Sequence, residues 1–159
     1  MRYCWELIRH FFVSNSRHGT HSPFVYDLAS RVIYHVSHVR PHTVKIPLDF
    51  KPKYRSLLLD ILTYMDVGEL GYLGQPDCAE AVLVDLRNVP SDEIIQAVRE
   101  GKIVVVHEPF QTRKTKRVWQ ELVKSTDIVV SINLFYFGLL MYRKEQRKEN
   151  FCLRYPFWK

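Results

Sequence analysis

Cysteine is scarce in this sequence, and its scarcity argues against two kinds of stabilisation. The three cysteines, Cys4, Cys78 and Cys152, are odd in number, lie far apart and form no CxxC pair. A disulfide framework or a structural zinc site is therefore disfavoured, and a reducing compartment is favoured. Glycine and proline are also sparse, with six and eight residues among 159, which argues against a disordered or fibrous chain.

Long hydrophobic runs are missing as well. The longest candidate, residues 128–142, is interrupted by Ser131, Asn133 and Gly138 and is shorter than the roughly 18 apolar residues of a membrane-spanning helix. Residues 1–13 mix charged side chains with apolar ones, whereas a secretory signal needs an uninterrupted apolar stretch. The sequence therefore predicts a cytoplasmic protein with no membrane partner.

Motifs that mark common catalytic sites are lacking. The chain has no Walker loop, no GxGxxG and no GxSxG, so a P-loop, a dinucleotide fingerprint and a nucleophile elbow are not supported. Two histidine pairs have helical spacing, His18 with His21 and His35 with His38. Because His18 precedes the expected helix and no cysteine or acidic ligand lies close to the pairs, we expect no metal site.

What the sequence does contain is an alternation of helical and strand-like segments. Apolar residues recur at helical spacing in residues 2–13, 23–38, 53–65, 91–99 and 112–124, with Ser22 and Ser91 as expected caps. Strands are expected at residues 69–73, 81–86, 102–107, 128–133, 137–143 and 151–154. Residues 81–86 and 102–107 are the most continuously apolar, so they should be adjacent, parallel and central.

This order of elements predicts an α/β fold. Strands that alternate with helices imply right-handed crossovers and a parallel sheet, and residues 128–133 and 137–143 are close enough to pair as a hairpin. We expect a doubly wound, mostly parallel, Rossmann-like sheet with an antiparallel C-terminal hairpin. Prolines within residues 39–52 mark a linker, so residues 1–50 form a helical extension and residues 51–159 form the α/β domain of one structural unit.

The two ends of the chain resemble one known family. Residues 18–26, HGTHSPFVY, resemble the HGxHSPF N-terminal signature of a group of class I S-adenosylmethionine-dependent methyltransferases common in Bacteroidetes. Residues 130–154 are similar to the C-terminal hairpin and tail of the same bacterial group, and residues 81–123 match it in layout only. The resemblance implies a methyltransferase-like fold, although members of the group are usually longer.

The resemblance also implies a degenerate cofactor site. In the family, the first strand ends in an acidic residue and a glycine-rich turn, for which Glu69, Gly71 and Gly74 are the rough equivalents. Two further strand–helix units then follow, and one of them supplies the acid that holds the ribose. Only residues 75–80 separate Gly74 from the next strand, whereas each crossover needs about a dozen residues or more. We therefore expect the units and S-adenosylmethionine binding to be lost.

Residues at two other strand ends are the candidates for chemistry. The resemblance places Asp85 where the family carries an acidic residue near the methyl-transfer site, and His107 with Glu108 where the family tends to carry a pair of aspartates. Together with Glu69 they are expected to line one crevice at the carboxyl ends of the strands, where such sheets bind ligands. The alternative is that these acids are solvated loop residues without a role.

A basic run, residues 111–117 (QTRKTKR), begins an expected helix. Arg113, Lys114, Lys116 and Arg117 would repel the positive end of the helix macrodipole unless an anion binds there, and Arg113, Lys114 and Arg117 are the candidate anion-binding residues. A phosphate or nucleic acid is one interpretation, and a solvated basic face is the other. The net charge of +6 permits both.

Three functions stay open at this point. The leading hypothesis is a methyltransferase-like protein without a cofactor that acts as a non-catalytic binding or interaction module, with a homodimer as one arrangement. The second is a working S-adenosylmethionine-dependent methyltransferase acting on a small molecule, and the third is a phosphate- or nucleic-acid-binding protein. Because loss of two units leaves residues 69–73 at a sheet edge, aromatic residues should be buried on the domain or in a twofold interface. These are Trp5, Phe12, Phe24, Phe157 and Trp158.

Overall fold

The computed structural model of the chain describes residues 2–15, 22–35, 44–75 and 79–157. His18, His21 and His38 lie outside these ranges, as do Cys78 and Trp158. The helices are α1 (Arg2–Val13), α2 (Pro23–Leu28), the π-helical turn η2 (Ala29–Ile33), α3 (Arg55–Tyr64), α4 (Ser91–Arg99) and α5 (Arg113–Leu122). The strands are β1 (Leu70–Tyr72), β2 (Ala81–Asp85), β3 (Ile103–His107), β4 (Val130–Asn133), β5 (Phe137–Met141) and β6 (Glu149–Cys152).

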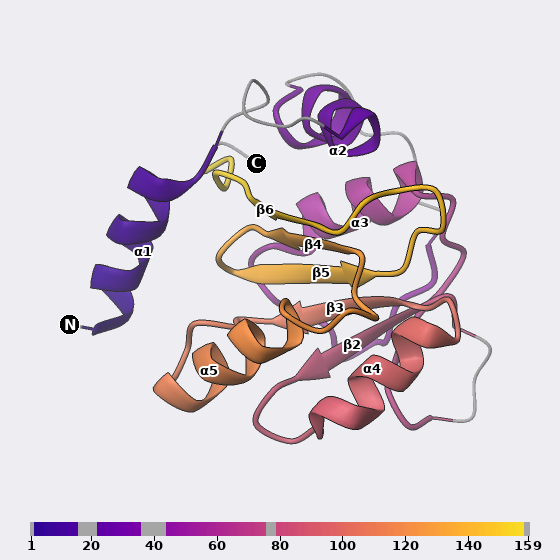
Figure 1. Cartoon of the computed structure of the whole chain (residues 1–159). Helices are drawn as coiled ribbons and strands as arrows, with labels where there is room; N and C mark the ends of the chain where they lie inside the picture. The colour runs from indigo at the N-terminus through magenta and orange to yellow at the C-terminus, as the bar shows by residue number, and fades with distance from the viewer. Residues whose placement is uncertain (1, 16–21, 36–43, 76–78, 158–159) are drawn as a thin grey trace.

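The strands form one six-stranded mixed sheet in the order β1-β2-β3-β5-β4-β6. β1, β2 and β3 run parallel, β5 runs antiparallel between β3 and β4, and β6 pairs parallel with β4 at the far edge (Figure 1). The α/β class, the adjacent parallel pair β2–β3 and the antiparallel β4–β5 hairpin are confirmed. Among the described residues, no helix is both long enough and apolar enough to cross a membrane.

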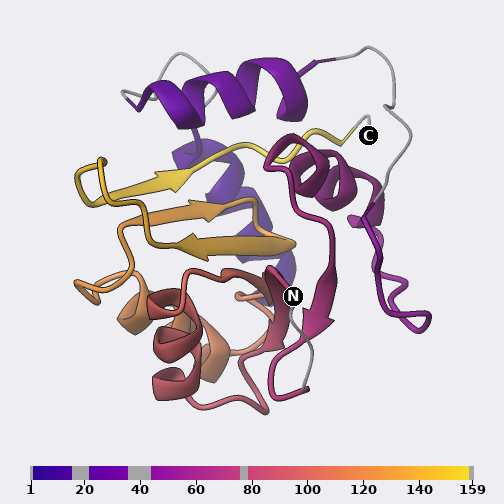
Figure 2. The ribbon, with the colours of Figure 1, turned by 90° about the vertical axis from the view of Figure 1, so that its right-hand side faces the viewer.

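Helices cover both faces of the sheet. Gly138 of β5 faces α5, and a Cβ atom at this position would lie 2.3 Å from the ring of Trp119. The preceding residue, Phe137, stacks on Tyr54 at the start of α3 with ring centroids 4.7 Å apart. Because neighbouring side chains of a strand point to opposite faces, α5 and α3 lie on opposite sides, and Figure 2 shows α4 on the same side as α5.

Both edges of the sheet are paired with short extended stretches from the N-terminal part of the chain. At β1, Lys45 donates its N–H to the carbonyl of Gly68 and accepts from the N–H of Leu70, at 2.9 Å each. At β6, Asn15 donates to the carbonyl of Cys152 at 2.8 Å and accepts from the N–H of Arg154 at 3.1 Å. The segment around β1 is therefore a sheet edge, as expected, but extended backbone covers it instead of helices.

Two expected features of the helices are wrong. Ser91 does not cap α4, because Pro90 occupies the cap position with extended backbone and Ser91 is already the first helical residue. The α-helix that begins at Pro23 ends at Leu28 and continues only as η2, where the N–H of Tyr34 donates to the carbonyl of Ala29 at 2.9 Å. The predicted cap Ser22 is confirmed, since its hydroxyl accepts from the N–H of Val25.

The aromatic residues near the two ends lie largely in solvent. Trp5 is 66% exposed, Phe12 is 79% exposed and Phe157 is 56% exposed, whereas Phe24 is half-buried beneath the guanidinium group of Arg143. The expectation that these side chains are buried on their own domain is therefore wrong for the first three. For Trp5 and Phe12 the reason lies in α1 (Arg2–Val13), which packs on the domain through its other face. A twofold interface stays a prediction.

Candidate functional site at the carboxyl ends of the parallel strands

The candidate site lies where β2 and β3 end. Asp85, the last residue of β2, is in register with His107, the last residue of β3, and Glu108 follows directly. The structure therefore brings three of the sequence-predicted residues together at the carboxyl ends of parallel strands, the position at which doubly wound sheets bind their ligands. Each of the three is positioned by a different partner.

The carboxylate of Asp85 forms a salt bridge with the guanidinium group of Arg87. The Nε atom of Arg87 donates to Oδ1 of Asp85 at 3.0 Å, and its Nη2 atom donates to Oδ2. These hydrogen bonds hold the pKa of Asp85 below its usual range. A carboxylate that is ionised and neutralised in this way is a weak proton acceptor at neutral pH.

His107 is fixed by a buried phenol. The hydroxyl of Tyr54, a residue 1% exposed, lies 2.5 Å from Nδ1 of His107. Burial raises the pKa of Tyr54 far above its ordinary value, so the phenol keeps its proton. The hydroxyl donates to Nδ1 or accepts from it, according to the tautomer of the imidazole.

Glu108 accepts two side-chain hydrogen bonds, one from a distant helix and one from a residue close by in the sequence. The hydroxyl of Tyr3 on α1 donates to Oε1 at 3.3 Å, and Nε2 of Gln111 donates to Oε2 at 3.2 Å. Burial, reinforced by Glu108, raises the pKa of Tyr3. Glu108 also has a positive φ of 37°, an uncommon conformation for a residue with a side chain, and its N–H donates to the carbonyl of Tyr136 at 3.0 Å.

Four residues of this site were missed from the sequence: Tyr3, Tyr54, Arg87 and Gln111. Arg87 and Gln111 lie two and three residues from their acids, so their spacing offered a signal. Tyr3 and Tyr54 come from separate helical regions 105 and 53 residues away from their partners, and no local pattern indicates such pairs.

The expected cofactor residues are dispersed. Glu69 precedes β1 and is level with the start of β2, where its carbonyl accepts from the N–H of Ala81 at 3.2 Å, so it lies at the opposite end of the strands from Asp85. Gly71 sits within β1, and a Cβ there would lie 3.1 Å from that of Ala79. Only Gly74, with a φ of 88°, turns the chain at the carboxyl end. Glu69 therefore does not line the expected crevice.

The basic run lies at the start of α5, close to the candidate site. Thr112 caps the helix and forms a capping box with Thr115, each side chain accepting from the other residue's N–H at 3.0 Å. Arg113, Lys114 and Arg117 are exposed. Exposed basic side chains fit a solvated face as well as a bound anion, so phosphate or nucleic-acid binding here stays a prediction.

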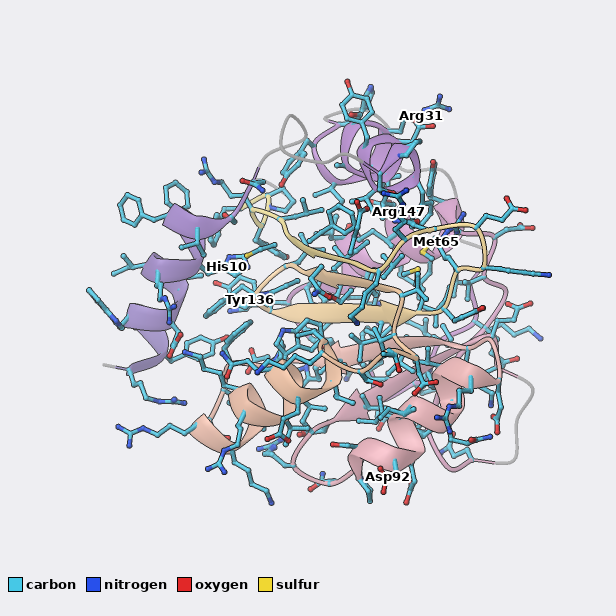
Figure 3. The ribbon with its side chains drawn as sticks, in the orientation of Figure 1. His10, Arg31, Met65, Asp92, Tyr136 and Arg147 are labelled. Carbon is cyan, nitrogen blue, oxygen red and sulfur yellow. The ribbon has the colours of Figure 1, made fainter. Side chains whose placement is uncertain are left out.

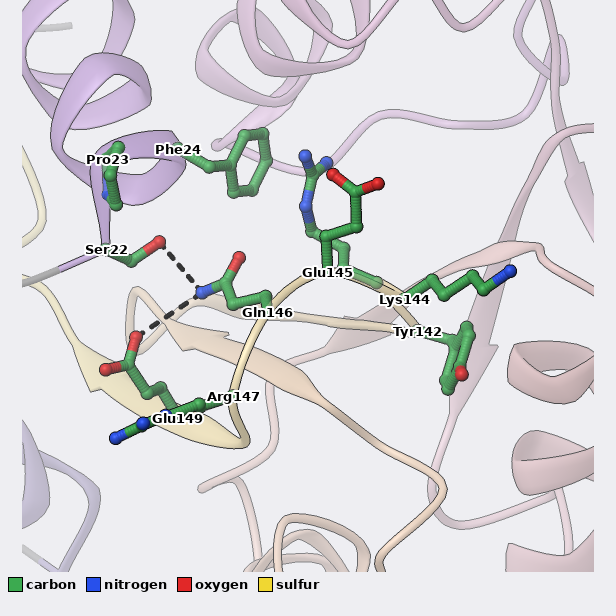
Figure 4. Close-up of a pocket in the computed structure, with 10 residues that line it drawn as sticks. Ser22, Pro23, Phe24, Tyr142, Lys144, Glu145, Gln146, Arg147 and Glu149 are labelled. Atoms are coloured by element: carbon green, nitrogen blue, oxygen red, sulfur yellow. Dashed lines mark hydrogen bonds between the residues drawn. The ribbon is translucent and has the colours of Figure 1, made fainter.

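An open cavity lies at the other end of the sheet. It has a volume of about 710 Å³, opens widely to solvent, and is lined by the start of α2 and by the loop between β5 and β6. Figure 4 shows Gln146 at its centre, where Nε2 donates to the hydroxyl of Ser22 at 2.8 Å and to Glu149 at 3.4 Å. Gln146 therefore ties the loop to α2, and the cavity does not reach Asp85 or His107.

Comparisons with models of known protein families, with curated proteins and with solved structures found no match to this chain.

Proposed function

We propose that this chain is a methyltransferase-like protein that has lost S-adenosylmethionine binding and acts as a non-catalytic interaction module. The observation that carries the proposal is that Asp85, His107 and Glu108 each bond to another side chain of the same chain. A catalytic group must be within hydrogen-bond reach of its substrate. At these strand ends His107 and Glu108 instead bond to Tyr54 and Tyr3 from distant parts of the chain, and Asp85 pairs with Arg87 two residues away.

The strand order supports descent from a larger doubly wound sheet. In the common order 3-2-1-4-5-6, the second and third strands lie outside the first, and the ligand crevice opens beside the first strand where the order reverses. Removal of those two units would leave the first strand at an edge beside the fourth. β1 is at such an edge, and only residues 73–80 join it to its parallel neighbour β2. The ligand crevice beside the first strand would then be bounded by strands on one side only.

The outward face of α1 supports the role in interaction. Trp5, Ile8 and Phe12 follow helical spacing along one stripe and are 66%, 49% and 79% exposed. Soluble monomers rarely expose large continuous apolar patches unless these bind something. We propose a second copy of the chain as the occupant, because an apolar stripe meets its own copy across a twofold axis without needing opposite charge.

Calorimetric titration with S-adenosylmethionine tests the loss of the cofactor. We expect no binding, and a dissociation constant below about 100 μM would contradict the proposal. In that case the variants Asp85→Asn and Glu108→Gln decide where the ligand sits. Loss of binding in both would support a working methyltransferase site at the strand ends.

Light scattering coupled to gel filtration tests the interaction surface. The wild type should run as a dimer, and the double variant Trp5→Ser, Phe12→Ser should run as a monomer with unchanged circular dichroism. The matched control is Leu48→Ser, which removes a side chain that is 98% exposed but distant from α1 in the sequence. A wild type that is monomeric at its highest soluble concentration, or a control that dissociates equally, argues against a dimer through α1.

A further inference from the structure

The outward face of α5 is strongly basic. The helix carries four cations in ten residues and a single acid, Glu121. One of these cations, Lys116, is matched by Glu6 of α1. The other three, and Lys124 in the turn that follows the helix, are exposed and form no ion pair or side-chain hydrogen bond with other described residues. The basic face of α5 therefore consists of Arg113, Lys114, Arg117 and Lys124.

Three members of the basic face lie in one row. Arg113, Arg117 and Lys124 follow one another at intervals of four and seven residues, the spacing that keeps side chains on one side of a helix. With the rise per residue of an α-helix, the row is about 16 Å long. Lys114 lies next to it. Positive charge clustered along one side of a helix is the electrostatic footprint of a nucleic-acid-binding surface, and the net charge of +6 adds to it.

The basic face acts through its side chains more than through the start of the helix. Thr112 and Thr115 form a capping box, which occupies two of the backbone N–H groups that an anion at the helix start would use. What remains is an extended row of long cationic side chains. Such a row fits a ligand that presents several anionic groups along a line better than it fits a single small anion.

The polar character of the basic face selects among polyanionic partners. The exposed residues between its cations are Gln120 and Glu121, whereas Trp119 and Leu122 are buried. A helix that binds a membrane surface inserts an apolar face, and a protein interface needs a buried apolar centre. A sugar–phosphate backbone needs neither, because its binding comes from the counterions that Lys and Arg side chains release.

We propose that the basic face of α5 binds the sugar–phosphate backbone of a nucleic acid, with one phosphate contact from each of Arg113, Lys114, Arg117 and Lys124. Contacts that are confined to phosphates carry no direct information about base sequence, so the binding is non-specific. The assignment depends neither on the loss of S-adenosylmethionine binding nor on a dimer through α1, because it uses neither the strand ends nor the apolar stripe of α1.

The test is the fluorescence anisotropy of a short labelled DNA duplex titrated with the full chain at several salt concentrations. Four phosphate contacts predict that the binding constant falls about 150-fold between about 50 and 200 mM salt, a logarithmic slope of about −3.6. The double variant Arg113→Gln, Arg117→Gln keeps two of the contacts, so its slope should be about −1.8. A wild type that does not bind at the lowest salt concentration, or binds without salt dependence, would overturn the assignment.

A second double variant, Lys144→Gln, Arg147→Gln, removes the same charge from another place. Both residues are exposed in the loop between β5 and β6, and Figure 3 shows Arg147 well away from α5. This matched control should keep the slope of the wild type, and circular dichroism verifies that each variant is folded. An equal loss of binding in the two double variants would mean that net charge alone attracts the DNA, and would contradict the proposed surface.

Two further probes distinguish the source of the anionic groups. An RNA duplex of the same sequence carries the same backbone charge, so binding to either duplex supports the proposal, and the tighter binder identifies the nucleic acid. Vesicles that contain phosphatidylserine present negative charge without a sugar–phosphate backbone. Vesicle binding that is lost in Arg113→Gln, Arg117→Gln, together with no binding to either duplex, would assign the basic face to a lipid surface and overturn the proposal.

Discussion

α1 and α5 are neighbouring amphipathic helices that use their faces in opposite ways. α5 buries Trp119 and Leu122 against the sheet and exposes its basic residues, as a surface helix usually does. α1 turns Trp5 and Phe12 to solvent and directs polar groups inward, including His10. Amphipathic spacing therefore marks a helix with two distinct faces but does not decide which face packs on the domain.

The inward contacts of α1 are mainly polar. Glu6 accepts from Nζ of Lys116 on α5 at 2.7 Å, and both side chains are less than one-fifth exposed, at 13% and 19%. Tyr3 and Leu7 pack beside them on the core. A helix attached by a few polar contacts is released more readily than one attached by a tryptophan in a packed interface. We therefore expect α1 to contribute little to global stability compared with α5.

The largest expected effect comes from comparing one tryptophan of each helix. Trp119→Ala should lower the free energy of unfolding by about 3–5 kcal/mol, because the ring fills the space over Gly138 and leaves a cavity. Trp5→Ala should change it by less than about 0.5 kcal/mol, because most of its side chain is already in water. Urea denaturation of dilute protein measures both. Equal losses would mean that α1 is packed as tightly as α5.

A smaller effect is expected from the ion pair that joins the two helices. Glu6→Gln leaves the ammonium group of Lys116 without its counter-ion in a mostly buried position, and should cost about 1–3 kcal/mol. The matched control is Asp27→Asn, which breaks the exposed i,i+4 pair between Asp27 on α2 and Arg31 in η2 and should cost only about 0.3–0.5 kcal/mol.

Denaturation gives these two values, and limited proteolysis locates the change. Glu6→Gln should speed cleavage after Arg9 on α1 without speeding cleavage in α5. If Glu6→Gln costs no more than Asp27→Asn, the pair does not anchor α1.

The sequence predicted the sheet better than the site. Apolar runs of five or six residues indicate buried strands wherever they occur, so β2, β3 and the β4–β5 hairpin were placed correctly. Asp85, His107 and Glu108 followed as strand-end residues. The hydrogen-bond partners of these residues were not predicted. Contacts such as Tyr3 with Glu108 join residues 105 positions apart and depend on how α1 packs on the domain.

The orientation of α1 was predicted wrongly for a related reason. Burial was expected for the stripe with the most apolar area, which contains Trp5, Ile8 and Phe12. The structure instead buries the stripe with polar partners available on α5 and at the end of β3, namely Tyr3, Glu6 and His10. Tertiary contacts determine which face of a helix is buried, and helical spacing alone does not predict those contacts.

The smallest expected effect is a pH dependence carried by His10. Burial lowers the pKa of His10 below its usual value, so the unfolded chain binds a proton more readily than the folded one. Above about pH 6.5, the ordinary histidine pKa, His10 is neutral in both the folded and the unfolded chain, and the free energy of unfolding is at its full value. As the pH falls below this value, the unfolded chain takes up the proton first and the free energy of unfolding decreases. Glu6, Arg9, Lys116 and Cys152 line a cavity together with His10, and the Glu6–Lys116 pair adds no net charge there.

The measurement is the difference in unfolding free energy between wild type and His10→Leu at pH 7.5 and at pH 5.5. Since the variant has no proton to take up at this position, the difference should move in favour of the variant by up to about 1 kcal/mol on acidification. The other six histidines are shared by both proteins, so their titration cancels. A difference that is the same at both pH values would show that His10 is solvated and that the inward face of α1 is not closed.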